Sequence, residues 1–140
     1  SSKASSIKIK KFHKKIEKKF HNITKQSNVF YRPWGNYINL TYGKGYLIKE
    51  LTVNPKSSIS LQKHKHRSEH WTIIEGKPRI TLDNKKFYKK KFETVYIPKG
   101  SIHRIENTYN KPVKIVEVQI GSILKETDII RYEDVYDRVK

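Results

Sequence analysis

Short runs of β-forming residues, separated by turn-forming residues, occupy most of the chain after residue 28 and constrain its fold more than any other feature. The runs are rich in Ile, Val, Thr, Tyr and Phe, which favour strands. Turn signals such as Asn54-Pro55, Glu75-Gly76 and Asp83-Asn84 separate them. Many short strands without intervening helices are typical of a β-sandwich or a β-barrel. The expected strands are residues 46–53, 58–62, 70–74, 78–82, 87–88, 94–97, 103–106 and 113–118.

The first 28 residues have a different character. They contain nine lysines and one acid, Glu17. Apolar residues recur among them at the spacing of one helical face, and lysines occupy the other face. We therefore predict a basic amphipathic helix or linker over residues 1–28 and a β domain over residues 29–140. Such a helix can lie on an anionic surface, but we expect it to pack on its own domain or on a second subunit.

Composition narrows the classes of function. The length of 140 residues suits one domain, and the absence of cysteine excludes disulfides and thiolate metal sites. No apolar run is long enough to span a membrane, and residues 1–9 lack the apolar stretch of a signal peptide, so we expect a cytoplasmic protein. The net charge of +18 suggests an anionic partner, such as nucleic acid or a phosphorylated substrate. It is also compatible with lysines that merely cover solvated faces.

The histidine-rich segment 60–71 carries the clearest chemical signal. Alternate side chains of a strand share a face, so Gln62, His64 and a possible third member, His66, are expected to point the same way. Glu69 follows a predicted tight turn, and His103 follows a Pro-x-Gly turn that can return it to a neighbouring strand. Two imidazoles, a carboxylate and an amide oxygen suit a tetrahedral or octahedral metal site with open positions.

Two spacings in this part of the chain resemble the motifs of the cupin superfamily. The first is Gln62-x-His64-x4-Glu69-x6-Gly76, with Gln in place of the first His, and the second is Pro98-x-Gly100-x2-His103-x3-Asn107. Each motif normally begins with a glycine, and here Lys56 and Phe92 stand at those places. The resemblance implies an all-β cupin, that is, a double-stranded β-helix or jelly-roll barrel, preceded here by the predicted N-terminal α-helix.

The chain resembles one family within this superfamily more closely. The isomerase modules of type II mannose-6-phosphate isomerases carry runs similar to Arg32–Tyr37, Ile59–Trp71, Ile97–Arg104 and Ile115–Gln119. The resemblance covers roughly residues 29–138. It implies an isomerase of mannose 6-phosphate and fructose 6-phosphate that feeds GDP-mannose and polysaccharide precursor synthesis. The guanylyltransferase domain that precedes the module in most relatives has no counterpart here, so we expect no guanylyltransferase activity. The module is expected to be freestanding or part of a longer protein.

The resemblance also implies a site. We predict one divalent metal held by Gln62, His64, Glu69 and His103, with zinc first because the set resembles that of type I mannose-6-phosphate isomerases. Manganese, cobalt, nickel and iron also suit these ligands. Proton transfer is assigned to His66 or His70, whichever faces the cavity, with Glu117 as a rival base. The predicted catalytic residues are thus Arg67, His66, His70 and Glu117, and the predicted substrate-binding residues are Lys49, Arg104 and Arg131.

Several alternatives stay open. Alternation along a strand means that Arg67 and Arg104 need not both face the cavity, and each arginine could instead pair with Glu69, Glu106 or Asp134. The tail departs from the family pattern at Ile123, Lys125, Thr127 and Asp137. This departure favours a non-catalytic cupin that binds a sugar phosphate or sugar nucleotide, and a different cupin isomerase or epimerase is a third reading. A nucleic-acid binder fits the charge but not the motifs. We expect a homodimer, formed through edge strands or the N-terminal stripe.

Overall fold

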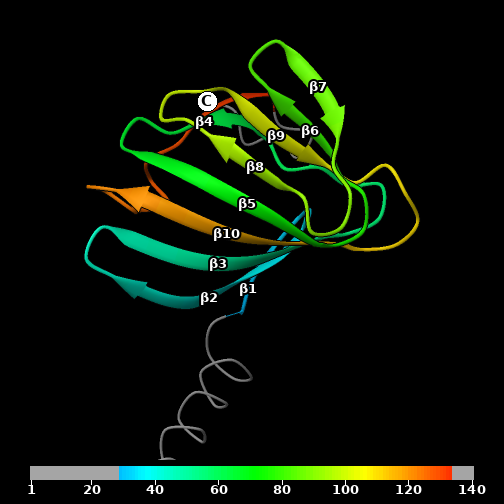
Figure 1. Ribbon diagram of the computed structural model, residues 1–140, viewed down its shortest axis with the longest axis horizontal. Coiled ribbons are helices and arrows are strands. Elements are labelled where there is room, and N and C mark those ends of the chain that lie inside the picture. Colours follow the sequence, from blue (N-terminus) through cyan, green and yellow to red (C-terminus); the bar gives the residue numbers. More distant parts are fainter. Residues whose placement is uncertain (1–28, 134–140) are drawn as a thin grey trace, which may run out of the picture.

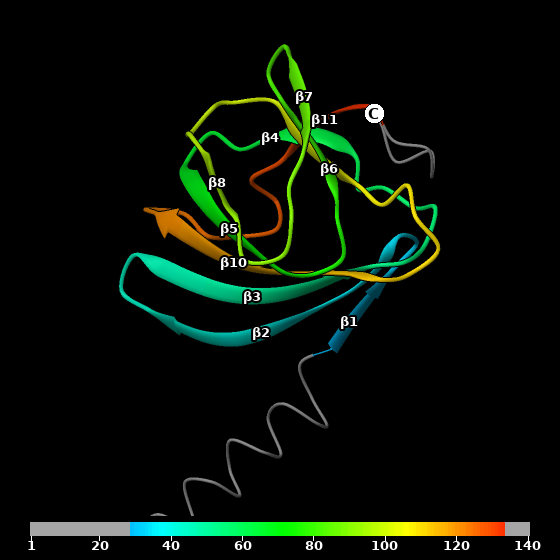
Figure 2. The same ribbon diagram turned by 45° about the vertical axis from the view of Figure 1, so that its right-hand side comes forward.

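Two antiparallel sheets face each other in the computed structural model of the protein, which describes residues 29–133 (Figure 1). The larger sheet has the strand order β1-β2-β3-β10-β5-β8. Its strands are β1 (Val29–Arg32), β2 (Gly35–Gly43), β3 (Tyr46–Val53), β10 (Val113–Gly121), β5 (Arg67–Glu75) and β8 (Thr94–Ile97). The smaller sheet has the order β11-β4-β9-β6-β7, formed by β11 (Ile130–Glu133), β4 (Leu61–Lys63), β9 (His103–Glu106), β6 (Arg79–Leu82) and β7 (Lys85–Tyr88). Figure 2, turned by 45°, shows the sheets curving around a shared interior.

The interior is apolar at one end and polar at the other. The reason is that the inward-facing residues of β3, β5 and β10 are apolar in one half of each strand and polar in the other half. In β10 the buried positions run from Val113 and Ile115 to Glu117 and Gln119. The same change occurs along β3 and β5, so that Trp71, Ile73, Leu51 and Val53 form the apolar end and Lys49, Arg67 and Glu69 the polar end. Register aligns them, with Glu117 opposite Lys49 and Gln119 opposite Glu69.

The apolar end holds the barrel together. Ile73, Ile80, Ile105 and Ile115 have no exposed surface, and both sheets contribute to this cluster. Burying each side chain contributes roughly 1.5–3 kcal/mol before conformational entropy is subtracted. Asn107 anchors the rim of this end, since its Nδ2 donates to the carbonyls of Val53 and Lys111 at 3.0 and 2.7 Å. The polar end therefore rests on a well-packed base.

The all-β prediction is confirmed, and several of its strands match closely. The expected runs 46–53, 94–97 and 103–106 are β3, β8 and β9. Strands β1, β2 and β11 were not predicted: β2 contains Gly35, two asparagines and a bulge near residue 40, all of which weaken a strand pattern. The helix expected in residues 1–28 lies outside the described residues, and the division at residue 28 stays a prediction. Within residues 29–133 no helix of membrane-spanning length and hydropathy is found.

The two positions where the motifs normally have glycine keep a glycine-like backbone. Lys56 has φ of 57° and Phe92 has φ of 71°, both in the left-handed region. A side chain with a Cβ is strained there. The turns are therefore preserved although the residues that favour them are not.

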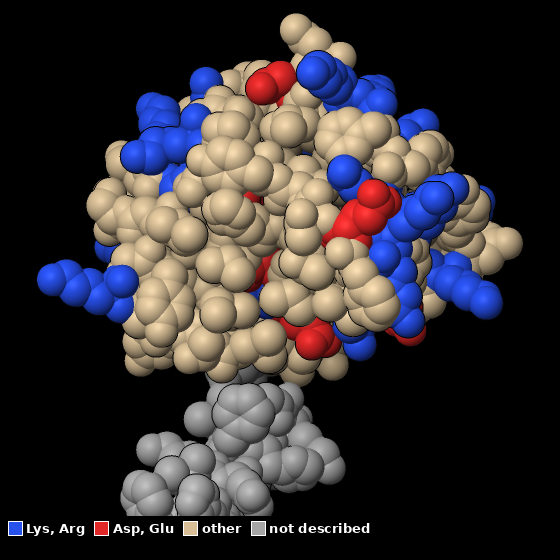
Figure 3. Space-filling model, in the orientation of Figure 1, with Lys and Arg blue, Asp and Glu red and all other residues tan. Residues whose placement is uncertain are grey.

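The outer face of the larger sheet carries apolar side chains that contact solvent. Tyr96 and Ile120 are 52% and 45% exposed, and His70 stacks beside Tyr96 with ring centroids 4.7 Å apart. Figure 3 views the molecule from this side and shows Lys and Arg mostly toward the rim. The predicted homodimer stays a prediction.

Candidate metal centre and cavity

Three buried side chains form a compact group at the polar end. His64 follows β4, Glu69 belongs to β5 and His103 begins β9, and one ligand atom from each lies within 4.8 Å of the others. All three are at most 3% exposed. Gln62 of β4 lies opposite His103 in the strand register and lines the adjoining cavity. Three of the four predicted ligands therefore form one group, and the fourth, Gln62, lies beside it, where its Oε1 accepts a hydrogen bond from the hydroxyl of Ser60 at 3.0 Å.

Backbone carbonyls fix which nitrogen each histidine presents. Nδ1 of His64 lies 2.6 Å from the carbonyl of Asp128, and Nδ1 of His103 lies 3.0 Å from the carbonyl of Ser101. A carbonyl only accepts, so both Nδ1 atoms carry the proton and both Nε2 atoms present a lone pair to the centre. A carbonyl behind the distal nitrogen is the arrangement that orients histidine ligands in metal sites.

The side chains of His64, Glu69 and His103 present acceptor atoms to a common centre, as the ligands of a cation do. Nε2 of His64 lies 3.1 Å from Oε1 of Glu69, and NH2 of Arg67 donates to the same Nε2 at 3.2 Å, so the guanidinium supplies part of the positive charge that two such acceptor atoms require. Nε2 of His103 is buried and makes no hydrogen bond to any described residue. Two imidazoles and a carboxylate are ligands that zinc and other divalent transition metals accept. The residues present therefore fit a divalent metal.

Arg67 and Trp71 hold the carboxylate of Glu69 in place. Nε of Arg67 donates to Oε1 at 3.1 Å, and Nε1 of Trp71 donates to Oε2 at 3.0 Å. Burial alone would raise the pKa of Glu69. The close contact with His64 and the positive charge of Arg67 instead hold this pKa well below its usual range. The carboxylate is therefore ionised and oriented at neutral pH, as a metal ligand must be. The alternative reading of Arg67 as the ion-pair partner of Glu69 is thus confirmed.

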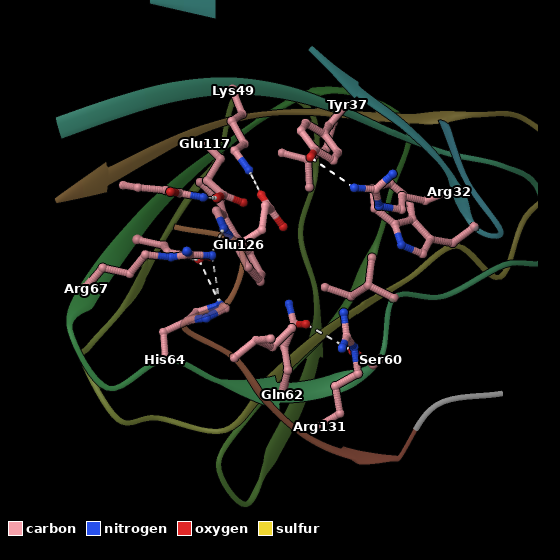
Figure 4. Close-up of a pocket in the computed structure, with 17 residues that line it drawn as sticks. Arg32, Tyr37, Lys49, Ser60, Gln62, His64, Arg67, Glu117, Glu126 and Arg131 are labelled. Carbon is pink, nitrogen blue, oxygen red and sulfur yellow. Dashed lines mark hydrogen bonds and ion pairs between the residues drawn. The ribbon is translucent and has the colours of Figure 1, made fainter. Parts of the chain in front are cut away.

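A cavity opens beside this group, between the two sheets (Figure 4). Its polar lining mixes cations, carboxylates and amides. The cationic and acidic members are Arg32, Lys49, Arg67, Arg131, Glu69, Glu117 and Glu126. Trp34, Leu51, Ile59, Trp71 and Ile129 supply apolar walls. Such a lining can hold a small, polar, anionic molecule.

Glu117 faces this cavity from β10 and is 5% exposed. Burial, followed by the nearby charge of Glu69, raises the pKa of Glu117 to about 7, while Lys49 and Arg67 oppose the rise. Nε2 of Gln119 donates to one of its carboxylate oxygens. A carboxyl group with this pKa exchanges protons readily near neutral pH, which is the property of a general acid–base catalyst.

The segment between β10 and β11 closes one side of the cavity like a strap, defined here as Lys125–Asp128. NH1 of Arg67 donates to the carbonyl of Lys125 at 3.2 Å. The carboxylate of Asp128 accepts the backbone N–H groups of Lys65 and His66, each at 3.0 Å. Glu126 forms an ion pair with Lys49. The strap thus contacts the turn that follows β4 as well as the cavity.

The two histidines proposed for proton transfer lie away from the cavity. His66 is exposed, and its Nδ1 lies 3.2 Å from Oδ1 of Asp128. His70 is on the outer face of β5 against Tyr96. The condition that one of them faces the cavity is not met, because β4 ends at Lys63 and alternation along β5 turns His70 outward. Of the predicted proton carriers, only Glu117 lines the cavity.

Two of the three predicted substrate-binding residues line the cavity and the third does not. Lys49 and Arg131 line the cavity. Arg104 does not, since it alternates with His103 along β9, and its Nε donates to the carbonyl of Ile59 at 3.0 Å. Sequence reasoning assigned no role to Arg32, Tyr37 or Glu126, which also line the cavity. The Arg32–Tyr37 run was available as a signal, whereas Glu126 stands in a loop without periodicity.

Comparisons with known proteins show the family of the chain. Residues 18–134 match the family model described as "Mannose-6-phosphate isomerase C-terminal". The chain is 40% identical to the alginate biosynthesis protein AlgA of Pseudomonas putida over 93% of this chain and 27% of that protein. It is 41% identical to the mannose-1-phosphate guanylyltransferase ManC of Salmonella typhimurium over 78% of this chain and 23% of that protein. The chain thus spans about a quarter of the length of these relatives.

A solved structure supports the fold. The Cnp3 cupin domain of Schizosaccharomyces pombe superposes with a TM-score of 0.62, at 16% identity, over 69% of each chain. The two-sheet architecture is therefore that of a cupin. Because the family model covers most of the chain and the histidine and glutamate side chains meet in a cupin interior, the chain belongs to the family of mannose-6-phosphate isomerase C-terminal domains.

Proposed function

We propose that this domain is a metal-dependent aldose–ketose isomerase that interconverts mannose 6-phosphate and fructose 6-phosphate. Such a reaction would feed GDP-mannose and polysaccharide synthesis, in line with the names of the relatives. The observation that carries the proposal is one cavity lined by a buried carboxyl group with a pKa of about 7 and by ligands suited to a divalent metal. We also propose a cytoplasmic location.

From mannose 6-phosphate to fructose 6-phosphate, the isomerisation moves one proton from C2 to C1 and the hydroxyl proton from O2 to O1. Glu117 is the candidate that takes the proton from C2 and returns it at C1, because it faces the cavity and its pKa suits both steps. The guanidinium of Arg67 lines the same cavity and can stabilise negative charge on the sugar oxygens during the transfer. Trp34 and Trp71 restrict water on the apolar side.

His64, Glu69 and His103 would hold the metal, with the amide of Gln62 beside them. When bound, a divalent metal supplies a Lewis acid that polarises the sugar carbonyl. We propose zinc because imidazole and carboxylate ligands suit it, with manganese, cobalt, nickel and iron as alternatives. Nδ1 of each histidine, held by a backbone carbonyl, keeps the metal-binding nitrogen directed at the centre.

A coupled assay for fructose 6-phosphate formed from mannose 6-phosphate tests the proposal. Metal-loaded protein, chelated protein and the His64→Ala variant are compared, and His70→Ala serves as a matched control because His70 lies on the outer face. We expect turnover in metal-loaded protein and in the control, and none in the other two samples. A folded, metal-loaded protein without turnover would refute the isomerase and favour the non-catalytic sugar-phosphate binder.

A further inference from the structure

Three cationic side chains from three strands surround one carboxylate of the strap. Lys49 of β3 forms an ion pair with Glu126. Arg67 of β5 and Arg32 of β1 also act on it, because all three positive charges lower the pKa of Glu126 against the opposing effect of burial. Figure 4 shows Glu126 reaching between the labelled side chains into the middle of the cavity. The carboxylate of Glu126 therefore occupies the position beside Lys49 that an anionic ligand could otherwise occupy.

Lys49 and Glu126 differ in how easily they can move. The Lys49 side chain is 6% exposed, and its Nζ lies 4.2 Å from the centroid of the Tyr37 ring. NH2 of Arg32 donates to the hydroxyl of Tyr37 at 3.2 Å and holds this ring in place. The Glu126 side chain is 53% exposed. Glu126 can therefore rotate into solvent, which leaves Lys49 as a buried cation. Its remaining acidic neighbour, Glu117, has a pKa of about 7 and is only partly ionised at neutral pH. An external anion can take the vacated position.

The rest of the strap does not depend on Glu126. Arg67 holds the carbonyl of Lys125, and Asp128 accepts two backbone N–H groups from the turn after β4. These contacts use neighbouring residues, so the side chain of Glu126 can turn while the backbone on both sides stays in place. The strap then remains as a wall of the cavity.

We propose that Glu126 is an internal substitute for the anionic group of the ligand, and that a phosphate monoester binds at Lys49 by displacing it. The inference rests on the proposed function in naming a phosphorylated sugar as the ligand. A phosphate carries up to about two negative charges at neutral pH, against one for the carboxylate. It therefore interacts more strongly than Glu126 with the positive charges of Lys49 and Arg32. Glu126 thus favours phosphorylated over neutral sugars, because only an anionic ligand replaces the negative charge that Lys49 loses when Glu126 turns away.

Calorimetric titration of the metal-loaded chain with inorganic phosphate and with mannose tests this inference. Glu126→Gln removes the competing charge, so we expect phosphate to bind about tenfold more tightly and mannose to bind as in the native chain. Glu50→Gln is the matched control, because Glu50 loses the same charge but pairs with Lys114 at 3.5 Å on the outer face. Its phosphate affinity should equal that of the native chain.

A second pair of variants locates the phosphate. Lys49→Met should lose phosphate binding, and Lys49→Arg should retain it while keeping the buried cation. Phosphate affinity unchanged or weakened in Glu126→Gln, or retained in folded Lys49→Met, would overturn the inference. These titrations need no turnover. A chain without isomerase activity can still show the Glu126 effect, and an active isomerase can lack it, so the two proposals fail separately.

Discussion

Nε2 of His103 lies 3.8 Å from Oε2 of Glu69, in a part of the structure where neither side chain is more than 3% exposed to solvent. This nitrogen has no hydrogen-bond partner among the described residues, although an unsatisfied buried acceptor costs roughly 1–3 kcal/mol. A metal bound by these side chains would remove that cost. The binding of metal should therefore stabilise the folded chain as well as prepare it for reaction.

We predict that His103→Ala lowers the metal content from one ion per chain to a small fraction of that value. The loss of one strong ligand from a small donor set explains the effect. Elemental analysis after dialysis measures it, and zinc-dependent thermal stabilisation should disappear in the same variant. His70→Ala, which changes a histidine on the outer face, should keep full metal content. Equal metal content in both variants would contradict the assigned centre.

We predict that Glu117→Gln lowers kcat by roughly 10²- to 10⁴-fold, the usual contribution of a positioned acid–base group. The amide keeps the shape of the carboxyl group and its contact with Gln119, but it cannot carry a proton. In the native chain, the rate should rise with pH as Glu117 ionises, below the pKa of about 7 that this carboxyl group has in the metal-free chain, because a bound cation offsets the charge of Glu69. Steady-state rates from pH 5.5 to 8.5 measure both effects, and a variant with native kcat would exclude Glu117 as the base.

The same residue predicts a pH dependence of stability. Burial raises the pKa of Glu117 from 4.5 to about 7, so the unfolded chain releases the proton at lower pH than the folded chain does. The stabilisation is complete below 4.5 and is lost as the pH rises to about 7. Urea unfolding of metal-free protein should therefore show that Glu117→Gln gains stability relative to the native chain between pH 4.5 and 8. A constant difference across that range would contradict the shift.

We predict that Phe92→Gly stabilises the chain by about 1 kcal/mol, because glycine removes the strain of a left-handed backbone. The matched change is Gly100→Ala at φ of 83°, where an added Cβ meets no atom within 4 Å. This change isolates backbone strain and should destabilise by a similar amount. Chemical denaturation measures the free energy of unfolding of both variants. Equal stabilities of Phe92→Gly and the native chain would show that other contacts of Phe92 offset the strain.

The grouping of the candidate metal ligands could be predicted in part from the sequence, because strands impose a simple geometry. Gln62 belongs to β4, Glu69 lies inside β5, and His103 starts β9, so their residue spacing determines where they meet. The rule stops at Lys63, where β4 ends, and beyond it the carbonyl of Asp128 orients His64 and the carboxylate of Asp128 contacts His66. The strap was still less predictable, because a loop has no repeating pattern that gives the direction of Glu126.

Two of the strap's contacts with the site are made by main-chain oxygens. The carbonyl of Asp128 orients His64, and the carbonyl of Lys125 accepts from Arg67. Every residue type offers that same oxygen, so replacing the side chain at either position leaves the contact available. Inserting or deleting a single residue between Gly121 and Ile130 would instead shift both oxygens away from their partners. Side chains of this stretch other than those of Glu126 and Asp128, whose carboxylates make contacts of their own, can therefore vary during evolution while the number of residues stays fixed.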